Sequence, residues 1–493
     1  MFSPKWRYLK IFDGDSMATS FFDYPTPLQY VENSHTSKLL ESGDYVVTID
    51  DGAWALLSKD EHNLLKTHRV SEDPELFKRL ESLGIIITES NQEKTIDDYR
   101  ARFLHVFNGT SLHIVAITSR CNQRCLYCYM GPQPVSSKGF DMDEETAKKV
   151  VDFIFQSPSK VITLEFQGGE PLLNFPIIQY IIDYSKKLNK KYKKNLAYTM
   201  VTNLTLMRDD ILKYLLKNRV SICTSLDGPK EVHDKNRRYL GGGGTHDNVV
   251  HWIRDIRTQF SYKINALPVI TRFSLPYAQE IVDEYANLGL DRIRIKHIIP
   301  SGLARENWNK ISYTPEEYIN FWREALNYCF NINKNGKNFI EGTSVLIARK
   351  FLSRDYQSFT CLGWPCGAAL SQSSYDPWGN IRACDESREF EEFKLGNVKK
   401  DSYREIYTSP RALNTVALTS GLNSLCDACV WHPYCNNCIV ASFGMQGNPI
   451  SKLPLDYDCK IRKGLIEHIF KTLAYPSEYR KILMKWSSTK YGV

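Results

Sequence analysis

The sequence lacks any apolar run long enough to cross a membrane. No stretch of about eighteen consecutive apolar residues occurs in the chain, and its first segment, MFSPKWRYLKIFDGD, has no apolar core like that of a signal peptide. We therefore expect a cytoplasmic protein with no membrane partner. Internal repeats and low-complexity tracts are also missing. Since the hydrophobic share of 42% and the charged share of 24% are ordinary for a folded chain, disorder is not expected.

A strong excess of charge of one sign is missing as well. The formal net charge of +7 is mild for 493 residues. The densest basic run, residues 186–195, has no interleaved series of aromatic residues for stacking bases. We interpret it as the solvated end of a helix and expect no nucleic-acid partner. The glycine run 241–244 does not predict a phosphate-binding loop, because no strand precedes it and no Lys-Ser/Thr pair follows it.

Cysteine is the residue type that the chain has in unusual number. Eleven of the thirteen cysteines fall in two regions, residues 121–128 and 361–459. In a reducing cytoplasm this clustering is more typical of metal or iron–sulfur ligands than of disulfides. We expect the other two, Cys223 and Cys329, to be ordinary buried thiols.

The N-terminal part, residues 1–105, is predicted to form a winged-helix-like module. Residues 45–49 and 53–57 flank an Asp-Asp-Gly turn and predict a hairpin. Ser58 and Glu61 then have the spacing of a capping box at the start of a helix. A second helix and a returning strand are expected before the module ends.

Residues 106–300 are predicted to form an α/β unit with a parallel sheet, because short apolar runs alternate with amphipathic helical stretches. The strands are expected at residues 112–118, 161–167, 196–202, 220–226, 263–269 and 292–298. Six such βα units make a partial (β/α)6 barrel, similar to an incomplete TIM barrel. Chemistry in parallel barrels takes place at the C-terminal ends of the strands, and the first cysteine region follows the first strand there.

The remaining chain divides into three expected parts. Residues 301–360 predict a helical connector, in which residues 314–332 form the clearest amphipathic helix. Residues 361–470 predict a cysteine-rich domain with short irregular segments. Residues 471–493 are expected to be a C-terminal tail.

The first cysteine region holds Cys121, Cys125 and Cys128 in the spacing C-x3-C-x2-C, on a loop between a strand and a helix. Three thiolates that bind a four-iron cluster leave one iron without a protein ligand, and this iron can bind a small chelating molecule. The alternatives are three buried thiols or a zinc site completed by a distant residue such as His113. Closed zinc sites usually show paired C-x2-C spacings instead.

The stretch CNQRCLYC resembles radical S-adenosylmethionine (SAM) enzymes, together with FQGGEPLL at 166–173 and SLDGPKEVHDKNR at 225–237. The resemblance covers roughly residues 110–465. It is closest to anaerobic sulfatase maturases and to peptide-modifying enzymes with a C-terminal SPASM-type auxiliary cluster domain. The maturases of His-Xaa-Ser repeat systems are a weaker likeness.

The resemblance implies a four-iron, four-sulfur (4Fe-4S) cluster whose open iron binds the amino and carboxylate groups of SAM. An external donor of the flavodoxin or ferredoxin type would supply an electron. The reduced cluster then cleaves SAM to a 5′-deoxyadenosyl radical, which abstracts hydrogen from an unactivated carbon.

Several residues near the first cysteine region are candidates for contacts with SAM. Gly168 and Gly169 lack side chains, which lets backbone groups approach the methionine part of SAM, and Glu170 offers an acceptor to its ammonium group. The alternative is a plain strand-to-helix turn, which would need only one of the glycines. By the resemblance, Tyr127 lies beside the adenine.

Further candidates follow the third and fourth predicted strands. The resemblance makes Ser225 and Asp227 polar contacts to the ribose and the substrate side, and Arg237 part of the family's His-Asp-x-x-Arg element. The Asp-Gly-Pro sequence there is also compatible with a simple turn. Thr202 and Asn203 stand where the family carries Thr-Asn-Gly, which makes Asn203 a candidate contact. Leu204 replaces that glycine, which puts the geometry of the loop in doubt.

The cysteine-rich end has enough thiols for two more four-ligand sites, and their spacing alone suits either zinc or iron–sulfur clusters. The upstream resemblance favours two auxiliary 4Fe-4S clusters, and so three clusters in all. It assigns the first to Cys361, Cys366, Cys384 and Cys438, and the second to Cys426, Cys429, Cys435 and Cys459. Two residues separate Cys435 from Cys438 where relatives usually have three, which leaves open whether Cys438 is a ligand.

Asp385 is the candidate catalytic base. It directly follows Cys384, and an aspartate at this position in the sulfatase-maturase relatives takes a proton from the substrate. A carboxylate beside an apolar, cluster-bearing cavity can have its pKa raised into a useful range. The alternative is a hydrogen-bonded loop carboxylate without a role in catalysis.

We therefore predict a radical SAM maturase that acts on a ribosomally synthesised precursor peptide and produces a cross-link, thioether, epimer or other oxidised residue. The N-terminal module favours this function, because such modules recognise the leader of a precursor, typically by pairing it as an additional strand. A sulfatase-maturase-like enzyme that forms formylglycine is the alternative of the same class. An alternative of another class is a non-catalytic iron–sulfur electron carrier or metal-dependent binding protein.

Overall fold

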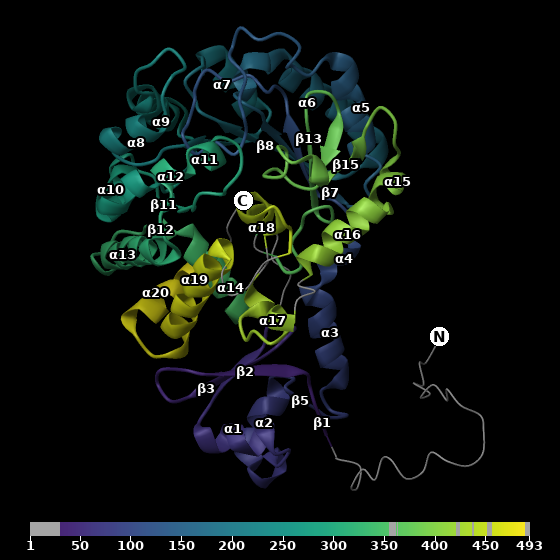
Figure 1. Ribbon diagram of the computed structural model, residues 1–493, viewed down its shortest axis with the longest axis vertical. Helices are drawn as coiled ribbons and strands as arrows, with labels where there is room; N and C mark the ends of the chain where they lie inside the picture. Colours follow the sequence, from purple (N-terminus) through teal and green to yellow (C-terminus); the bar gives the residue numbers. More distant parts are fainter. Residues whose placement is uncertain are drawn as a thin grey trace, which may run out of the picture.

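A curved, mostly parallel sheet forms the centre of the computed structural model, which describes residues 30–353, 361, 363–420, 424–435, 438–450 and 456–488 (Figure 1). Five parallel strands lie side by side in the order β10-β9-β8-β7-β6. They are β6 (Leu112–Ala116), β7 (Val161–Gln167), β8 (Asn195–Thr202), β9 (Val220–Ser225) and β10 (Asn265–Leu267). The first five predicted strands are therefore confirmed.

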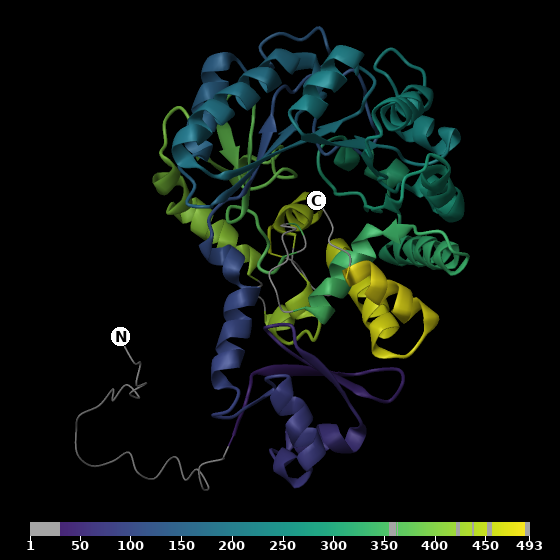
Figure 2. The same ribbon diagram turned by 180° about the vertical axis from the view of Figure 1, so that it is seen from behind.

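Helices connect these strands and cover the outer side of the sheet, as Figure 2 shows from behind. They are α5 (Glu144–Ile154), α6 (Phe175–Tyr192), α7 (Asp209–Lys217), α8 (Lys230–Asn236), α9 (His246–Phe260) and α10 (Ala278–Asn287). Buried and half-buried residues alternate along β9, because one face of the strand packs on these helices and the other lines the barrel interior. The α/β class with a parallel sheet agrees with the sequence pattern.

The strand predicted at residues 292–298 was expected to be the sixth strand of the barrel. The structure does not place it in the central sheet, which corrects that expectation. β11 covers Arg292–Ile293 and pairs in parallel with β12 (Ile340–Glu341), in a separate two-stranded sheet. A single bridge between Val269 and Lys296 links this segment to the chain just after β10. The segment therefore lies beside the end of β10, but with one bridge there it is not a strand of the central sheet.

The other edge of the central sheet is extended by the cysteine-rich part of the chain. β13 (Gln372–Tyr375) pairs in parallel with β6, and β14 (Asn380–Arg382) and β15 (Lys394–Asn397) continue the sheet in antiparallel fashion. The sequence did not predict β13, because its residues Gln-Ser-Ser-Tyr are polar although all four are buried. The pairing brings the cysteine-rich part beside the strand that leads to the first cysteine region.

Residues 30–88 form a smaller unit, called here the N-terminal module, with an apolar core of its own. Its elements are β1 (Val31–Glu32), β2 (His35–Leu39), β3 (Tyr45–Ile49), β4 (Trp54–Leu57), α1 (Lys59–Lys66), α2 (Pro74–Ser82) and β5 (Ile86–Ile87). The predicted hairpin is the β3–β4 pair, and Ser58 and Glu61 form the predicted capping box. β2 adds a third antiparallel strand that was not predicted. The winged-helix-like classification stays a prediction.

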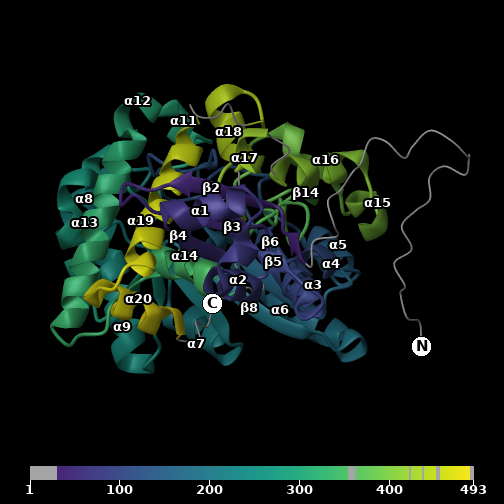
Figure 3. The same ribbon diagram turned by 90° about the horizontal axis from the view of Figure 1, so that it is seen from below.

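One face of the β2–β3–β4 sheet packs on the C-terminal half of the chain. Figure 3 shows the module lying over α14 (Gly342–Leu352) and α19 (Tyr457–Ala474). Trp54 Nε1 donates to Phe351 O at 3.0 Å, and the Trp54 ring meets Phe470 edge-on at 5.1 Å. The helix α3 (Gln92–Arg102) leads from the module to the barrel.

Short and long helices complete the described chain. They are α4 (Leu104–Phe107), α11 (Leu303–Glu306), α12 (Trp308–Ile311), α13 (Pro315–Lys334), α15 (Tyr403–Tyr407), α16 (Pro410–Thr419), α17 (Ser424–Asp427), α18 (Ile439–Gln446) and α20 (Glu478–Ser488). The expected boundary after residue 105 falls inside α4, and the one after residue 470 falls inside α19. Predictions for residues 1–29, 354–360 and 489–493 lie outside the described residues. Within the described ranges, no helix combines the length and apolarity that crossing a membrane requires.

Candidate active site

The three cysteines of the first region lie on the loop that follows β6. Cys121 and Cys125 are each 8% exposed, and Cys128 is half-buried. The backbone of this loop is bound to a later part of the barrel, since the amide of Leu126 donates to Asn236 O at 3.0 Å. The cysteines therefore sit at the C-terminal end of the sheet, as predicted from their place after the first strand.

Gly168 and Gly169 allow the end of β7 to lie directly against the cysteine loop. A Cβ atom on Gly168 would lie 2.4 Å from Thr118 O, and one on Gly169 would lie 2.1 Å from Arg120 O. The amide of Gly169 donates to Thr118 O at 2.8 Å. Backbone packing thus requires both glycines, which a plain turn would not. The reason predicted from the sequence for the two glycines was a different one, the approach of backbone groups to SAM.

Glu170 connects the ends of β7 and β8. It is 1% exposed and accepts hydrogen bonds from Thr202 Oγ1 at 2.6 Å, from the amide of Asn203 at 2.8 Å and from the amide of Leu172 at 3.1 Å. Burial raises the pKa of Glu170, and these hydrogen bonds oppose the rise. A carboxylate can accept about four hydrogen bonds, so one position is left for a ligand's ammonium group.

Asn203 links the end of β8 to the cysteine loop. Its Nδ2 donates to Asn122 Oδ1 at 2.9 Å, and its Oδ1 accepts from the amide of Thr205 at 3.0 Å. The next residue, Leu204, is fully buried and has a φ of 60°, in the left-handed region. The chain therefore keeps, with leucine, the backbone shape that glycine adopts without strain.

Tyr127, Asp227 and Arg237 form one buried group. The Tyr127 hydroxyl donates to the Asp227 carboxylate, lies 2.8 Å from both of its oxygens, and accepts from Arg237 Nη1 at 2.6 Å. Burial raises the pKa of Asp227 to about 6, with the Arg237 guanidinium as the main opposing influence. Ser225 lies half-buried at the end of β9, two residues before Asp227. The structure thus brings together three candidates that are up to 110 residues apart in sequence.

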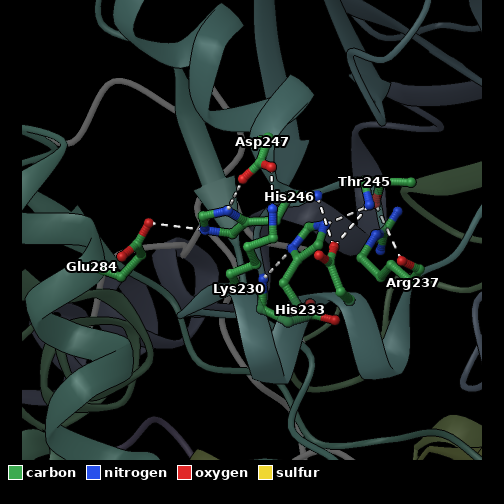
Figure 4. A network of polar contacts seen from close by, with 9 residues as sticks. Lys230, His233, Arg237, Thr245, His246, Asp247 and Glu284 are labelled. Atoms are coloured by element: carbon green, nitrogen blue, oxygen red, sulfur yellow. Dashed lines mark hydrogen bonds and ion pairs between the residues drawn. The ribbon is translucent and has the colours of Figure 1, made fainter. Parts of the chain in front are cut away.

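His233, the histidine of the His-Asp-x-x-Arg element, lies in a network of polar contacts with Thr245 and Arg237 (Figure 4). Its Nδ1 accepts from the amide of Asp227 at 3.2 Å, so its Nε2 carries the proton that faces Thr245 Oγ1 at 3.0 Å. Thr245 Oγ1 in turn donates to Arg237 O at 3.3 Å. No role for His233 was predicted, although its place in the His-Asp-x-x-Arg element was a usable signal.

His246 extends the same network toward the outer helices (Figure 4). Its Nε2 lies 3.1 Å from Glu284 Oε1 and its Nδ1 lies 3.3 Å from Asp247 Oδ1. Burial opposes protonation, but the hydrogen bonds to the two carboxylates outweigh it and raise the pKa of His246. Asp247 also forms an ion pair with Lys230, on α8.

Asp385 lies at the mouth of the barrel in a second buried polar group. Its carboxylate accepts from the Tyr129 hydroxyl and pairs with Arg388, whose Nη2 lies 2.6 Å from Asp385 Oδ1. Arg388 Nη2 also donates at 3.1 Å to Gln167, the last residue of β7. Burial raises the pKa of Asp385, while Arg388 lowers it. The sequence did not single out Tyr129 or Arg388, although each neighbours a predicted residue.

The residues around the cysteine loop fit an iron–sulfur cluster and a polar ligand. Burial raises the pKa of the Cys125 thiol to about 12, so its thiolate needs a cationic partner such as an iron core. Gln123 Nε2 and Arg237 Nε are buried donors that have no acceptor among the described residues. Such donors suit a ligand with several acceptor atoms.

The zinc alternative fits less well. Both ring nitrogens of His113 are engaged, with Tyr375 OH at 2.8 Å and Thr110 O at 3.1 Å, so His113 does not complete a site with the cysteines. In the part of the chain that the structure describes, no three thiol, imidazole or carboxylate groups converge as they do around a single metal ion. Cluster ligands are spread more widely, because each thiolate binds a different iron.

The cysteines of the second region fall into two groups according to their electrostatic neighbours. Burial, Glu386 and the thiols of Cys438, Cys366 and Cys361 raise the pKa of Cys384. Burial and nearby groups, among them the thiols of Cys435 and Cys429, raise the pKa of Cys459. The thiol of Cys429 also raises the pKa of Cys426. The first group is Cys361, Cys366, Cys384 and Cys438, and the second is Cys426, Cys429, Cys435 and Cys459. Asn436 and Asn437, which make the short spacing, lie outside the described residues.

A parallel α/β sheet with three cysteines at a strand end, a close glycine contact and buried polar donors is compatible with an iron–sulfur enzyme. Residues 115–272 match the radical SAM superfamily. An uncharacterized protein of Methanocaldococcus jannaschii is 32% identical over 273 residues, which are 52% of this chain and 89% of that protein. A cysteine-type anaerobic sulfatase-maturating enzyme of Clostridium novyi is 25% identical over 387 residues, or 74% of this chain and 98% of the relative. The chain belongs to the radical SAM superfamily and is an enzyme.

Solved structures show the same fold. The native enzyme anSMEcpe with bound AdoMet and Cp18Cys peptide has a TM-score of 0.63 and 21% identity, covering 74% of this chain and 98% of that chain. Streptococcus suis SuiB bound to the precursor peptide SuiA has a TM-score of 0.52 and 14% identity, covering 86% of this chain and 98% of that chain. Membership of the superfamily implies a 4Fe-4S cluster and SAM as cofactors, and it leaves the non-catalytic electron carrier without support.

Proposed function

We propose that this enzyme is a maturase that abstracts hydrogen from a residue of a ribosomally synthesised precursor peptide and leaves a cross-link, thioether, epimer or other oxidised residue. The N-terminal module carries the proposal. β2 is an edge strand, since it pairs with β3 on one side and lies at the end of its sheet. An extended leader peptide can add to such an edge through main-chain hydrogen bonds. SuiB, a solved relative in fold, binds a precursor peptide.

The cysteine loop and the ends of β7 and β8 would hold the cofactors. Cys121, Cys125 and Cys128 would hold the cluster whose open iron binds SAM. When bound, these groups supply the radical that abstracts hydrogen from the substrate. Glu170 would accept from the ammonium group of SAM, and Asn203 would hold the adjoining loop against the cysteines. An electron donor of the flavodoxin or ferredoxin type completes the set of partners.

The remaining polar residues would act on the ribose, the adenine and the substrate. The Tyr127 ring would lie beside the adenine, with its hydroxyl fixed by Asp227 and Arg237. Ser225 would contact the ribose. Asp385 would accept the substrate proton, and its contacts with Tyr129 and Arg388 hold the carboxylate in one orientation at the end of β7.

Two auxiliary 4Fe-4S clusters are part of the proposal, one for each of the two cysteine groups described above. The electrostatic neighbourhood of Cys384 supports the inclusion of Cys438 in the first group. The expected domain division at residues 105, 300, 360 and 470 is proposed as a functional division, with the barrel for radical formation and the cysteine-rich part for the auxiliary clusters.

The test is the intact mass of each short peptide encoded beside the gene, after anaerobic co-expression with this enzyme. Loss of two hydrogens is expected for a cross-link or thioether, and fragmentation would then locate the bond. Co-expression with the Cys125→Ala variant is the control and should give the unmodified mass. If every mass is unchanged, deuterium uptake tests for epimerisation, and its absence would contradict a peptide substrate.

A sulfatase-maturase-like activity is the second candidate, because the Clostridium novyi relative has that function by name. The two candidates differ in their need for a leader. A sulfatase-type maturase should convert a short peptide that carries a target cysteine or serine into formylglycine without any leader. The proposed maturase should modify a core peptide much faster when the leader is attached.

A further inference from the structure

A cavity of about 90 Å³ lies between the barrel segment after β11 and the helices α14 and α19. Its walls include Cys361 and Cys435, one from each of the two cysteine groups. Four cationic side chains also line it, namely Arg294, Lys296, Lys350 and Arg462. Glu386 is the one carboxylate among the described residues that line the cavity. The cavity therefore has an excess of positive charge.

Arg462 has a carboxylate partner just outside the cavity. Its Nε binds Asp458 Oδ2 at 2.5 Å, and Asp458 also accepts from His297 Nε2 at 3.0 Å. Asp458 is 3% exposed, so this pair is buried and hydrogen-bonded on both sides. Arg462 is thus compensated by the protein itself.

Lys350 is different, because no carboxylate of the described chain lies within ion-pair distance of it. The residue is 3% exposed, and its Nζ donates to Tyr434 O at 2.7 Å. Buried charges in proteins are normally paired, because an uncompensated one costs several kcal/mol. A single carbonyl dipole is a weak substitute for a counter-charge.

Thiols of both cysteine groups act on the charge of Lys350. Burial lowers the pKa of Lys350 to about 7, whereas Cys435 of the second group and Cys366 of the first raise it and so favour the charged form. A 4Fe-4S core with four thiolates carries a net charge of about −2 when oxidised, and it becomes more negative by one unit on reduction. Clusters on the two cysteine groups would therefore supply the missing negative charge.

The lysine is also fixed in place. It lies on α14, whose next residue, Phe351, stacks on Tyr434 with a centroid distance of 3.8 Å. Tyr434 directly precedes Cys435, so this stacking joins the helix to the cysteine segment. The ammonium group cannot turn away from the cavity without breaking its bond to Tyr434 O.

We propose that Lys350 is the shared counter-cation of the two auxiliary clusters and raises their reduction potentials. A fixed positive charge stabilises the reduced form of a cluster more than the oxidised form, because the reduced form is more negative. The auxiliary clusters would then accept electrons more readily than they would without the charge of Lys350. This inference rests on the two auxiliary clusters of the proposed function.

The experiment is a redox titration of the full-length, anaerobically purified enzyme, followed by electron paramagnetic resonance. Lys350→Met and Lys350→Gln remove the charge, and the glutamine keeps a donor for Tyr434 O. In both variants we expect the reduction equilibrium of at least one auxiliary cluster to fall about tenfold, a downward shift of about 59 mV for one electron. Lys350→Arg should stay near the parent value. The radical SAM cluster is the internal reference and should not shift.

Lys213→Met is the matched control, since Lys213 is exposed on the outer helix α7 and its loss changes the net charge equally. Parent-like potentials in Lys350→Gln with a full iron content would overturn the inference and leave the proposed function intact. About four iron atoms per parent chain, instead of about twelve, would overturn it by removing the auxiliary clusters, and that part of the proposed function with them. If Lys350→Met does not fold, Lys350→Gln and Lys350→Arg decide the question.

Discussion

The two cysteine regions are held in place by different parts of the molecule. The loop with Cys121–Cys128 is bound by backbone groups of the barrel, such as Asn236 O and Arg238 O. The segment between Cys429 and Cys435 is bound by side chains from distant elements, and these include the N-terminal module. The first region is therefore held mainly by the barrel and by the residues just after it, such as Ala304, whose amide donates to Cys128 O, whereas the second region also depends on the N-terminal module.

Three carbonyl groups of the second segment make this dependence visible. Val430 O accepts from Thr48 Oγ1 at 2.9 Å, Pro433 O from Arg102 Nη2 at 2.6 Å, and Tyr434 O from Lys350 Nζ at 2.7 Å. Thr48 belongs to the N-terminal module and Arg102 to the helix that follows it. The module is thus part of the wall around the proposed second auxiliary cluster, as well as a candidate leader-binding surface.

The largest effect should separate the two regions by their chemistry. Cys125→Ala removes one of three ligands from the proposed catalytic cluster, so we expect SAM cleavage to fall to background. Cys429→Ala should leave SAM cleavage at least partly intact while peptide modification is lost. The measurement is 5′-deoxyadenosine formed by the anaerobically reduced enzyme. Equal cleavage by the Cys125 variant and the parent enzyme would refute the site assignment.

The next prediction tests the contribution of the N-terminal module to the second region. Thr48→Val keeps the side-chain shape but removes the donor to Val430 O, which leaves a buried carbonyl unsatisfied at a cost of about 1–3 kcal/mol. We expect a lower melting temperature and a loss of iron, with SAM cleavage retained. Thr67→Val is the control, because Thr67 is exposed and bonds within α1. Full iron content in both variants would mean that the module does not support the second region.

The comparison also shows which features could be predicted from the sequence. The barrel strands and the cysteine loop were predicted because local patterns encode them: apolar runs of strand length and a close cysteine spacing. β13 was not predicted, since its polar residues are buried through hydrogen bonds such as Tyr407 OH to Ser373 Oγ at 2.8 Å. The short pairing of β11 was not predicted either, because its partner strand lies beyond α13.

Contacts between distant side chains were beyond the reach of sequence patterns. Tyr129 and Asp385 are 256 residues apart, and nothing local indicates that their side chains meet. The same holds for Thr48 and Val430, which are 382 residues apart. In contrast, the capping box of Ser58 was predicted correctly, because both of its partners lie within one helical turn.

A smaller effect is expected from the network behind Tyr127, and it depends on pH. The pKa of His246 is raised in the folded chain, so its charged form stabilises the fold. This contribution is complete below about pH 6.5 and is lost as the pH rises through the folded-state pKa. His246→Gln should therefore lower the melting temperature more at pH 6 than at pH 9.

The control for this effect lies on the same helix. His251 is exposed on α9, and its nearest carboxylate, Asp255, is 3.7 Å away. His251→Gln should change the melting temperature little at either pH. The iron content of the His246 variant should equal that of the parent, because the ring of His246 bonds to Glu284 and Asp247 and not to the cysteine loop. An effect of His246→Gln that is equal at both pH values would contradict the role of its charge.

The smallest predicted effect concerns Leu204, whose backbone is in the left-handed region although its side chain is fully buried. Replacing Leu204 by either alanine or glycine removes the packing of its side chain, which costs about 2–5 kcal/mol of stability. Alanine keeps the left-handed strain of about 1–2 kcal/mol, whereas glycine relieves it but adds about 0.5–1 kcal/mol of chain entropy. Leu204→Gly should therefore be more stable than Leu204→Ala by up to about 1.5 kcal/mol, in thermal unfolding of the two variants. The reverse order would mean that the loop leaves the left-handed conformation once the leucine is gone, and Asn203 would then no longer be held against the cysteine loop.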